Sequence, residues 1–224
     1  MSVAVMQAGT AVDELRRQNR EYYIDRIIPE RKPIYSFVKR TIDIAASLVG
    51  LLLLWFPMLV IAALIKVDSR GPVFFRQERL GKDGVPFIMY KFRSMYTNAE
   101  ENGPQWAAKI DWRCTRVGRF IRKSRMDELP QLINILRGDM SFVGPRPERA
   151  FFYDQFETYI HGFCNRLVVR PGLTGLAQVN GGYELKPEEK IIYDMEYIQN
   201  RSIRMDFVCI IKTVKLVFTH EGAR

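Results

Sequence analysis

The stretch IAASLVGLLLLWFPMLVIAALI, residues 44–65, contains no charged residue and decides the class of fold. About 20 apolar residues suffice for a helix to cross the hydrocarbon core of a bilayer. A signal peptide is disfavoured, because the stretch begins about 40 residues into the chain, lacks a small-residue cleavage site and exceeds a typical hydrophobic signal region. The alternative is a buried core helix, but Trp55 and Phe56 at the centre of so long an apolar run favour membrane association.

Whether this segment spans the membrane is a separate question. Cationic flanks prefer the cytoplasm, so a simple span would place one basic flank on the wrong side. Pro57, near the middle, removes a backbone hydrogen bond and kinks a helix. A kinked helix that enters and leaves on the cytoplasmic face satisfies both observations, although physics alone leaves a kinked span open. The flanking cations are Arg31, Lys32, Lys39 and Arg40 before the segment, and Lys66, Arg70, Arg76 and Arg79 after it.

The composition limits the kinds of partner and of site. A formal charge of +9 on 224 residues favours an anionic partner, which could be nucleic acid, an acidic membrane surface or a phosphorylated substrate. Three scattered cysteines and two histidines make neither a disulfide framework nor a zinc site. The chain also lacks the GxxxxGK[ST] phosphate-binding loop, a GxGxxG turn after a strand and a recognisable RNA-binding platform, so no nucleic-acid partner is expected.

The rest of the chain predicts a helical domain with a little sheet. Residues 71–95, with the GKDG turn, predict a hairpin, and 115–137 predict helices interrupted at Pro130. An aromatic-rich helix is expected over 149–163. The amphipathic run 202–218 either packs on the core or lies at a membrane interface. GDMSFVGPRPE (138–148) and VVRPGLTGLAQVNGG (168–182) are punctuated by Gly and Pro and predict ordered loops.

The stretch RKSRMDELPQL, residues 122–132, sets two adjacent carboxylates, Asp127 and Glu128, after a dense run of cations. Such a charge run is most often a solvated helix start. The alternative is an acidic catalytic pair in a site for an anion, supported by four clusters with cations near Gly, Pro or a short strand. Arginine's planar fork suits phosphate oxygens, so these cations together would bind a diphosphate. They are Lys91 and Arg93, Arg122, Arg146, and Arg170.

The carboxylate pair suits divided labour. On a helix, adjacent side chains point about 100° apart, so Asp127 and Glu128 would not both approach one atom in the same way. One could attack phosphorus and form an acyl phosphate, while the other holds a divalent ion such as Mg²⁺ that screens the phosphate charge. We expect the neighbouring cations to lower the pKa of the nucleophilic carboxylate and keep it ionised.

Four long motifs resemble the bacterial sugar transferase family, the monotopic polyprenyl-phosphate phosphoglycosyl transferases of exopolysaccharide and glycan assembly. They are KRTIDIAASLVGLLLL..P, GPVFFRQERLGKDG..F..YKFRSM, TRVGRFIRKSRMDELPQLINILRGDMSFVGPRPE and VRPGLTGLAQVNGGY. The resemblance covers roughly 35–224. It implies an α+β, predominantly helical monotopic membrane protein, with a kinked re-entrant helix over 35–70 and interfacial amphipathic helices. A small mixed α/β catalytic core in the cytoplasmic part, 71–224, completes that fold, and 1–34 is an accessory segment.

The resemblance also implies a reaction. A UDP-sugar gives its phosphosugar to undecaprenyl phosphate at the cytoplasmic face of the bacterial inner membrane, with Mg²⁺, yielding undecaprenyl-diphosphate-sugar and UMP. Asp127 would form a covalent phosphosugar intermediate and Glu128 would help to hold Mg²⁺. The family's basic, phosphate-binding motifs supply the remaining site residues, Lys91, Arg93, Arg122, Arg146 and Arg170.

Two departures from the family pattern stand out: Phe56 precedes the helix-breaking proline where Ser is common, and Leu176 replaces a common Trp. The PRPER and terminal EGAR stretches resemble members that transfer hexose-1-phosphate, which favours glucose or galactose. Two alternatives stay open at this point. One is a membrane-bound, Mg²⁺-dependent diphosphate hydrolase acting on nucleotide sugars or lipid diphosphates, and the other is a non-enzymatic anchor that binds anionic lipid.

Overall fold

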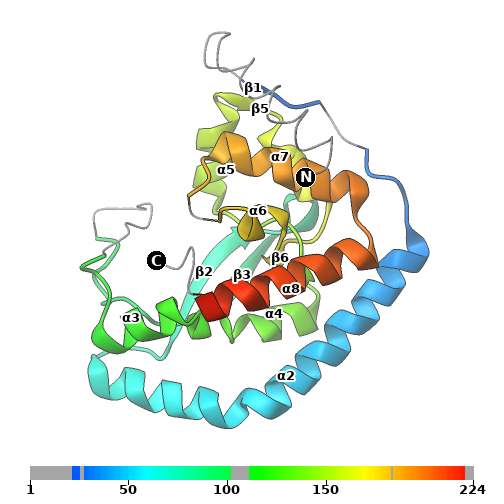
Figure 1. Cartoon of the computed structure of the whole chain (residues 1–224). Helices are drawn as coiled ribbons and strands as arrows, with labels where there is room; N and C mark the ends of the chain where they lie inside the picture. Colours follow the sequence, from blue (N-terminus) through cyan, green and yellow to red (C-terminus); the bar gives the residue numbers. More distant parts are fainter. Residues whose placement is uncertain (1–21, 26–27, 102–110, 183, 220–224) are drawn as a thin grey trace.

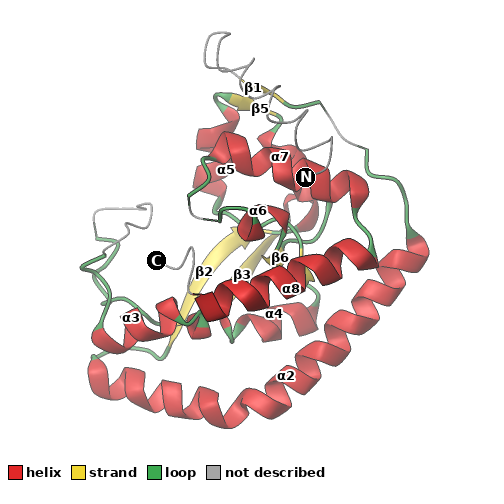
Figure 2. Ribbon diagram, in the orientation of Figure 1, coloured by secondary structure: helices red, strands yellow, loops and turns green. Residues whose placement is uncertain are grey.

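The computed structural model describes residues 22–25, 28–101, 111–182 and 184–219. The described chain is mostly helical with little sheet, as expected (Figure 2). The helices are α2 (Pro33–Asp68), α3 (Arg116–Lys123), α4 (Gln131–Arg137), α5 (Ala150–Glu157), α6 (Leu176–Val179), α7 (Pro187–Asn200) and α8 (Ile203–Thr219), with 3₁₀ turns η1 (Lys82–Gly84), η2 (Met126–Glu128) and η3 (Phe163–Val168). The strands are β1 (Tyr22–Tyr23), β2 (Phe74–Leu80), β3 (Pro86–Phe92), β4 (Ser141–Val143), β5 (Ile160–His161) and β6 (Gly172–Thr174).

The charge-free stretch 44–65 lies inside α2, which begins with Pro33 in its first turn and contains Pro57. At about 1.5 Å per residue, a 36-residue helix is about 54 Å long, well beyond the thickness of a bilayer core. Figure 1 shows α2 bent, with the rest of the protein on its concave side. The outer side of its middle carries exposed apolar side chains, among them Leu52, Leu53 and Trp55. The structure therefore agrees with a kinked helix and a monotopic membrane protein.

The predicted hairpin is confirmed. Strands β2 and β3 pair antiparallel, with Leu80 opposite Pro86 and Phe75 opposite Lys91. The turn between them places Asp83 and Gly84 at positive φ, which is what the GKDG sequence favours. The hairpin lies in the middle of the molecule, and α4 packs against β3 through Met89, Leu132 and Ile135.

Two pieces of sheet were not foreseen. Strands β4 and β6 pair in parallel within the two stretches predicted as loops, and β1 pairs in parallel with β5. At the first pairing the backbones approach so closely that a Cβ on Gly172 would lie 2.1 Å from the amide nitrogen of Gly144. Helices α5 and α7 lie between the β1–β5 pair and the rest of the molecule (Figure 1), and they contribute to the largest apolar core, which includes Phe163, Ile191 and Ile198.

The C-terminal end of α2 is bound to the hairpin and to α3. Arg93 is 5% exposed, and its guanidinium donates to the carbonyls of Ile65, Ser69 and Arg70 and to the hydroxyl of Ser69. Asp68 accepts a hydrogen bond from the amide of Val117 in the first turn of α3. These bonds satisfy backbone groups that helix ends leave without partners, so they fix the end of α2 relative to the hairpin.

The N-terminal half of α2 is bound to the same body of the protein. Arg40 donates to the carbonyls of Ile135 and Leu136 at 2.6 and 2.8 Å, at the end of α4. Buried Asp43 accepts from the amide of Phe142 in β4. Lys39 forms a 2.7 Å ion pair with Asp206 of α8. Both halves of the apolar helix are thus attached to the same core.

The expected helices over 149–163 and 202–218 are present as α5, which ends at Glu157, and as α8. Helix α8 turns Cys209 inward at 0% exposure and leaves Phe207, Ile211 and Val214 about half exposed or more. The outward apolar face favours the interfacial alternative over complete packing on the core. Most of the accessory segment 1–34 lies outside the described residues, and its described part includes β1.

Candidate active site

Asp127 and Glu128 lie on the 3₁₀ turn η2, between α3 and α4. Helix α3 ends because Arg125 adopts a left-handed conformation with φ of 57°, which is uncommon for a residue other than glycine. Pro130 is the N-cap of α4, and because its nitrogen carries no hydrogen, α4 begins as a helix separate from the turn. Strained backbone of this kind persists where the surroundings enforce it, and it gathers at functional sites. Here it places the carboxylate pair on a separate turn between the two helices.

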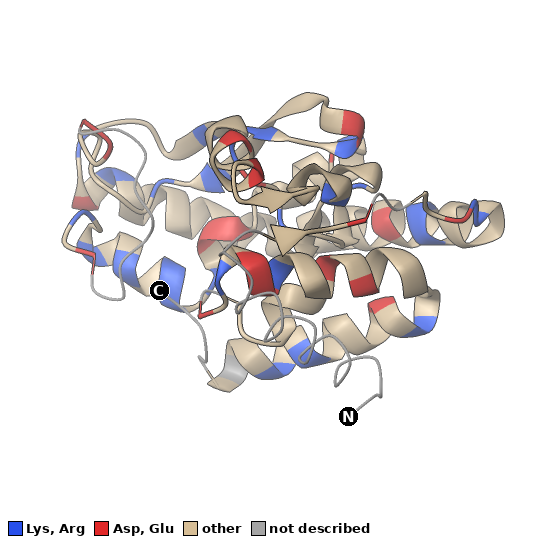
Figure 3. Cartoon of the chain, turned by 90° about the horizontal axis from the view of Figure 1, so that it is seen from above, with Lys and Arg blue, Asp and Glu red and all other residues tan. Residues whose placement is uncertain are grey.

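The two carboxylates line a cavity of about 480 Å³. Its basic wall combines residues from β3, α3 and the β4–α5 loop, and an apolar part is formed by Phe74, Phe75 and Phe152. Lys and Arg bands on α3 are visible in Figure 3, where acidic and basic segments also lie together in the middle of the molecule. The basic wall contains Arg79, Lys91, Arg93, Arg113, Arg122, Arg125, Arg146, Arg166 and Lys190.

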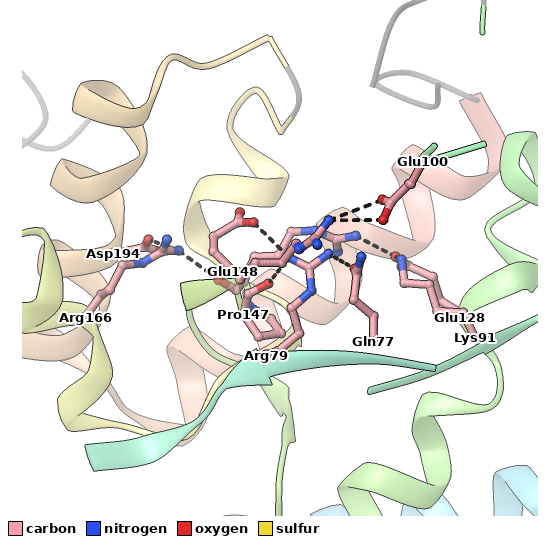
Figure 4. A network of polar contacts seen from close by, with 11 residues as sticks. Gln77, Arg79, Lys91, Glu100, Glu128, Pro147, Glu148, Arg166 and Asp194 are labelled. Carbon is pink, nitrogen blue, oxygen red and sulfur yellow. Dashed lines mark hydrogen bonds and ion pairs between the residues drawn. The ribbon is translucent and has the colours of Figure 1, made fainter. Parts of the chain in front are cut away.

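Glu128 is bound directly by two cations. Its Oε1 accepts from Lys91 at 2.9 Å and from Arg146 at 2.7 Å, and the carboxylate is buried (Figure 4 shows the Lys91 contact). Burial by itself would raise the pKa of Glu128, but the charges and hydrogen bonds of Arg146 and Lys91 outweigh burial and hold the pKa well below its usual range. Glu128 is therefore ionised at all physiological pH values.

Asp127 has a different environment. Burial, together with the neighbouring charge of Glu128, raises its pKa to about 6 against the opposing charges of Lys91, Arg122 and Arg146. The expectation that adjacent cations would lower the pKa of the nucleophilic carboxylate was therefore wrong: the pKa of Asp127 is raised, and the lowered pKa is that of Glu128, through Lys91 and Arg146. The reason is that two cations contact Glu128, whereas no described side chain is seen donating a hydrogen bond to Asp127.

The structure brings Lys91, Arg93, Arg122 and Arg146 to the cavity with the carboxylate pair. Arg93, however, directs its guanidinium to the end of α2, as described above, so its hydrogen bonds are used in fixing that helix. Arg170 is exposed and does not line the cavity. Of the five cations predicted from the motifs, three contact or surround the carboxylates, one binds α2 and one lies apart.

Sequence reasoning missed several polar residues of the cavity, among them Gln77, Arg79, Glu148 and Arg166. Arg79 donates to the carbonyl of Pro147 at 3.2 Å and to Glu148 at 3.1 Å, and also binds Gln77 (Figure 4). Arg166 lines the cavity from η3. A signal for Gln77 and Arg79 was present, because alternate residues of the predicted strand share one face with Phe75 and Lys91. No comparable local signal marks Arg166.

The described residues contain no group of three or more His, Cys, Asp or Glu side chains that could enclose a metal ion. This donor set still fits Mg²⁺, which is usually held by one or two carboxylates together with water and substrate phosphates. Lys91 and Arg146 both bind Oε1 of Glu128, and no described cation is seen to contact Oε2. An ion shared with a bound diphosphate suits this pair better than a site made by protein alone.

The fold and the site define a predominantly helical protein with one long apolar helix, compatible with monotopic membrane attachment, and a buried carboxylate pair in a basic cavity. The chain belongs to the bacterial sugar transferase family, whose model matches residues 34–220.

Curated relatives cover much of the chain. It is 48% identical over 195 residues to a UDP-N-acetylgalactosamine-undecaprenyl-phosphate N-acetylgalactosaminephosphotransferase of Aeromonas hydrophila, covering 86% of this chain and 46% of the relative. It is 43% identical over 190 residues to a UDP-glucose:undecaprenyl-phosphate glucose-1-phosphate transferase of Klebsiella pneumoniae (83% and 41%) and 44% identical over 193 residues to one of Caulobacter vibrioides (83% and 71%). The chain thus spans less than half the length of the first two.

Proposed function

We propose that this chain transfers a phosphosugar from a UDP-sugar to undecaprenyl phosphate, giving undecaprenyl-diphosphate-sugar and UMP. The observation that carries the proposal is the carboxylate pair in the basic cavity, with one pKa raised and one lowered. Divergent pKa values of neighbouring acids are a mark of divided catalytic roles. Family membership and the names of the relatives supply the substrate class.

In the first step a carboxylate oxygen of Asp127 attacks the sugar-linked phosphorus of the UDP-sugar. The bond from that phosphorus to the bridging oxygen breaks, and UMP leaves with the electron pair. An oxygen of the lipid phosphate then attacks the phosphorus of the aspartyl phosphosugar, the bond from that phosphorus to the Asp127 oxygen breaks, and undecaprenyl-diphosphate-sugar and the free carboxylate are formed. Lys91, Arg122 and Arg146 surround this position and would neutralise the phosphate oxygens.

Glu128 is the residue that we assign to Mg²⁺, with the diphosphate supplying further oxygens. When bound, Mg²⁺ screens the repulsion between carboxylate and phosphate and neutralises the leaving UMP. Lys91 and Arg146 keep Glu128 ionised, so that it can hold a cation at any working pH.

The acceptor is a membrane lipid, and the geometry of α2 supports attachment to one face of the bilayer. The core binds both Arg40 in the N-terminal half of α2 and Asp68 at its end, so both ends lie on the side of the core. We infer that α2 is re-entrant, that its exposed middle enters the inner membrane, and that the core faces the cytoplasm, where UDP-sugars are made. The exposed face of α8 would lie at the same interface.

Product identity tests the proposal. Purified protein in detergent is incubated with UDP-glucose, UDP-galactose or UDP-N-acetylgalactosamine and Mg²⁺, with and without undecaprenyl phosphate. We expect UMP and a lipid-linked sugar diphosphate to appear in equal amounts and only with the lipid. Steady UMP release without lipid would replace this proposal with the diphosphate hydrolase. The donor that reacts also identifies the sugar, because the relatives use both hexoses and N-acetylhexosamines.

A further inference from the structure

The loop between β4 and α5, residues 144–149, places Arg146 on Glu128, and two strands hold this loop from outside. Arg79 of β2 binds Pro147 and Glu148, and Leu80 donates its amide to the carbonyl of Glu148 at 3.1 Å. The amide of Gly172 in β6 donates to the carbonyl of Pro145 at 2.8 Å. These contacts leave the carbonyl of Arg146 itself to be fixed from the opposite side.

That contact comes from Arg166, whose Nη2 donates to the Arg146 carbonyl at 3.0 Å. Nη2 of Arg166 also lies 2.6 Å from a carboxylate oxygen of Asp194 on α7, and both side chains are 1% exposed. The guanidinium is 4.9 Å from the centre of the Phe163 ring. Figure 4 shows this pair on the side of the loop away from Glu128. Arg166 is therefore fully enclosed and held in one orientation.

A buried ion pair is a poor source of stability, because removing two charges from water costs about as much as their attraction returns. Pairs of this kind are better explained by what they orient. Here the enclosed guanidinium has one carboxylate partner behind it and one backbone carbonyl in front of it. The carbonyl belongs to the residue whose own guanidinium binds the catalytic pair.

We propose that Arg166 and Asp194 act as a positioning pair for Arg146, a role that rests on the function proposed above. Asp194 fixes Arg166, Arg166 fixes the backbone of Arg146, and Arg146 binds Glu128 at 2.7 Å. Helix α7 is in this way connected to the diphosphate site through two arginines, although no hydrogen bond or ion pair joins its described residues to Asp127 or Glu128. Neither Arg166 nor Asp194 needs to touch the substrate.

The double variant Arg166→Met/Asp194→Leu tests the proposal, because replacing both charges with apolar side chains of similar size leaves the fold intact in other buried pairs. Hydrogen exchange is measured at the amides of Leu80 and Gly172, which donate to the loop. We expect at least tenfold faster exchange there and unchanged exchange at Gly138, which bonds within the end of α4. Unchanged exchange at Leu80 and Gly172 would overturn the proposal.

Turnover supplies a second readout that a purely structural role would not move. The double variant should lower kcat about tenfold or more, and should have no further effect in an Arg146→Ala background, because coupled residues are not additive. Independent, multiplying losses would contradict a role through Arg146. If the double variant does not fold, Arg166→Lys, which keeps a positive charge beside Asp194 but does not place a nitrogen where Nη2 lies, should loosen the loop equally.

The two readouts separate this inference from the proposed function. If the parent protein transfers no sugar phosphate with any donor, the function fails, and hydrogen exchange still decides whether Arg166 and Asp194 hold the loop. If the parent transfers and the loop amides exchange as before, the positioning pair fails and the function stands.

Discussion

Asp127 and Glu128 are adjacent residues on one turn, yet their surroundings separate their chemistry. Glu128 is bound by Lys91 and Arg146 and stays ionised, whereas burial holds the pKa of Asp127 at about 6. A carboxylate that is slightly basic and incompletely paired is a better nucleophile than one fixed in two ion pairs. This asymmetry supports our proposal that Asp127 attacks the phosphorus and that Glu128 holds the cation.

The raised pKa predicts that Asp127→Asn stabilises the protein. The folded-state pKa lies above the ordinary value of 3.8, so the parent loses stability as pH rises from about 4 to about 6, and the variant does not. The shift corresponds to up to about 3 kcal/mol at pH 7. Thermal unfolding at pH 4 and pH 7.5 measures it: the variant should gain stability at the higher pH alone. A variant less stable than the parent at pH 7.5 would contradict the pKa.

The same pKa predicts the pH dependence of the first step. Asp127 must be ionised to attack, so the rate of UMP release in a single turnover should fall tenfold per pH unit below about 6 and level off above it. Glu128 adds no second limb in this range, because its pKa lies well below. Rapid-quench measurements between pH 4.5 and 8 check this. A rate of UMP release that begins to fall only near pH 4 would mean that Asp127 is not buried as described.

Much of the site could be predicted at the residue scale, and its energetics could not. The motifs identified the carboxylate pair and the cations Lys91, Arg122 and Arg146 that surround it. The order of the two pKa values depends on which carboxylate the cations touch and on burial, and neither is encoded in local spacing. Arg93 and Arg170 were misplaced for the same reason, because a cation beside Gly or in a strand can equally well bind a helix end or solvent.

At the scale of elements, the end of α2 depends on Arg93. Arg93→Met removes donors to three carbonyls and should lower the free energy of unfolding by about 2–4 kcal/mol. The exposed Arg170→Met is the matched control and should change it by less than about 0.5 kcal/mol. Chemical denaturation in detergent measures both. If Arg93→Met keeps its stability and raises only KM for the UDP-sugar, Arg93 binds substrate instead.

The elements themselves were partly predictable. Hairpin β2–β3, helix α8 and the break at Pro130 follow from alternation, amphipathic spacing and proline, which are local signals. The parallel pair β4–β6 joins Ser141 to Gly172, about thirty residues away, and depends on a close backbone approach at Gly144. Strands of three residues carry too little periodicity to be distinguished from loops.

At the scale of the whole molecule, the concave side of the bent α2 holds the core, and this arrangement predicts a re-entrant topology. Ile28, before α2, and Val67, near its end, are both 87% exposed. Each is replaced by cysteine, as Ile28→Cys and Val67→Cys. In a Cys164→Ser background both should react with a membrane-impermeant maleimide from the cytoplasmic side only. Leu52→Cys, exposed in the protein alone, should be protected by the bilayer. Labelling of the two ends from opposite sides would establish a span.

The central claim is the covalent role of Asp127, and intact-protein mass tests it most directly. The parent and Asp127→Asn are incubated with a UDP-sugar that supports turnover and Mg²⁺, without lipid acceptor. The account predicts a phosphosugar adduct on the parent alone, which is lost as lipid-linked product when undecaprenyl phosphate is added. An equal adduct on Asp127→Asn, or transfer to the lipid by a parent that never carries an adduct, would contradict it.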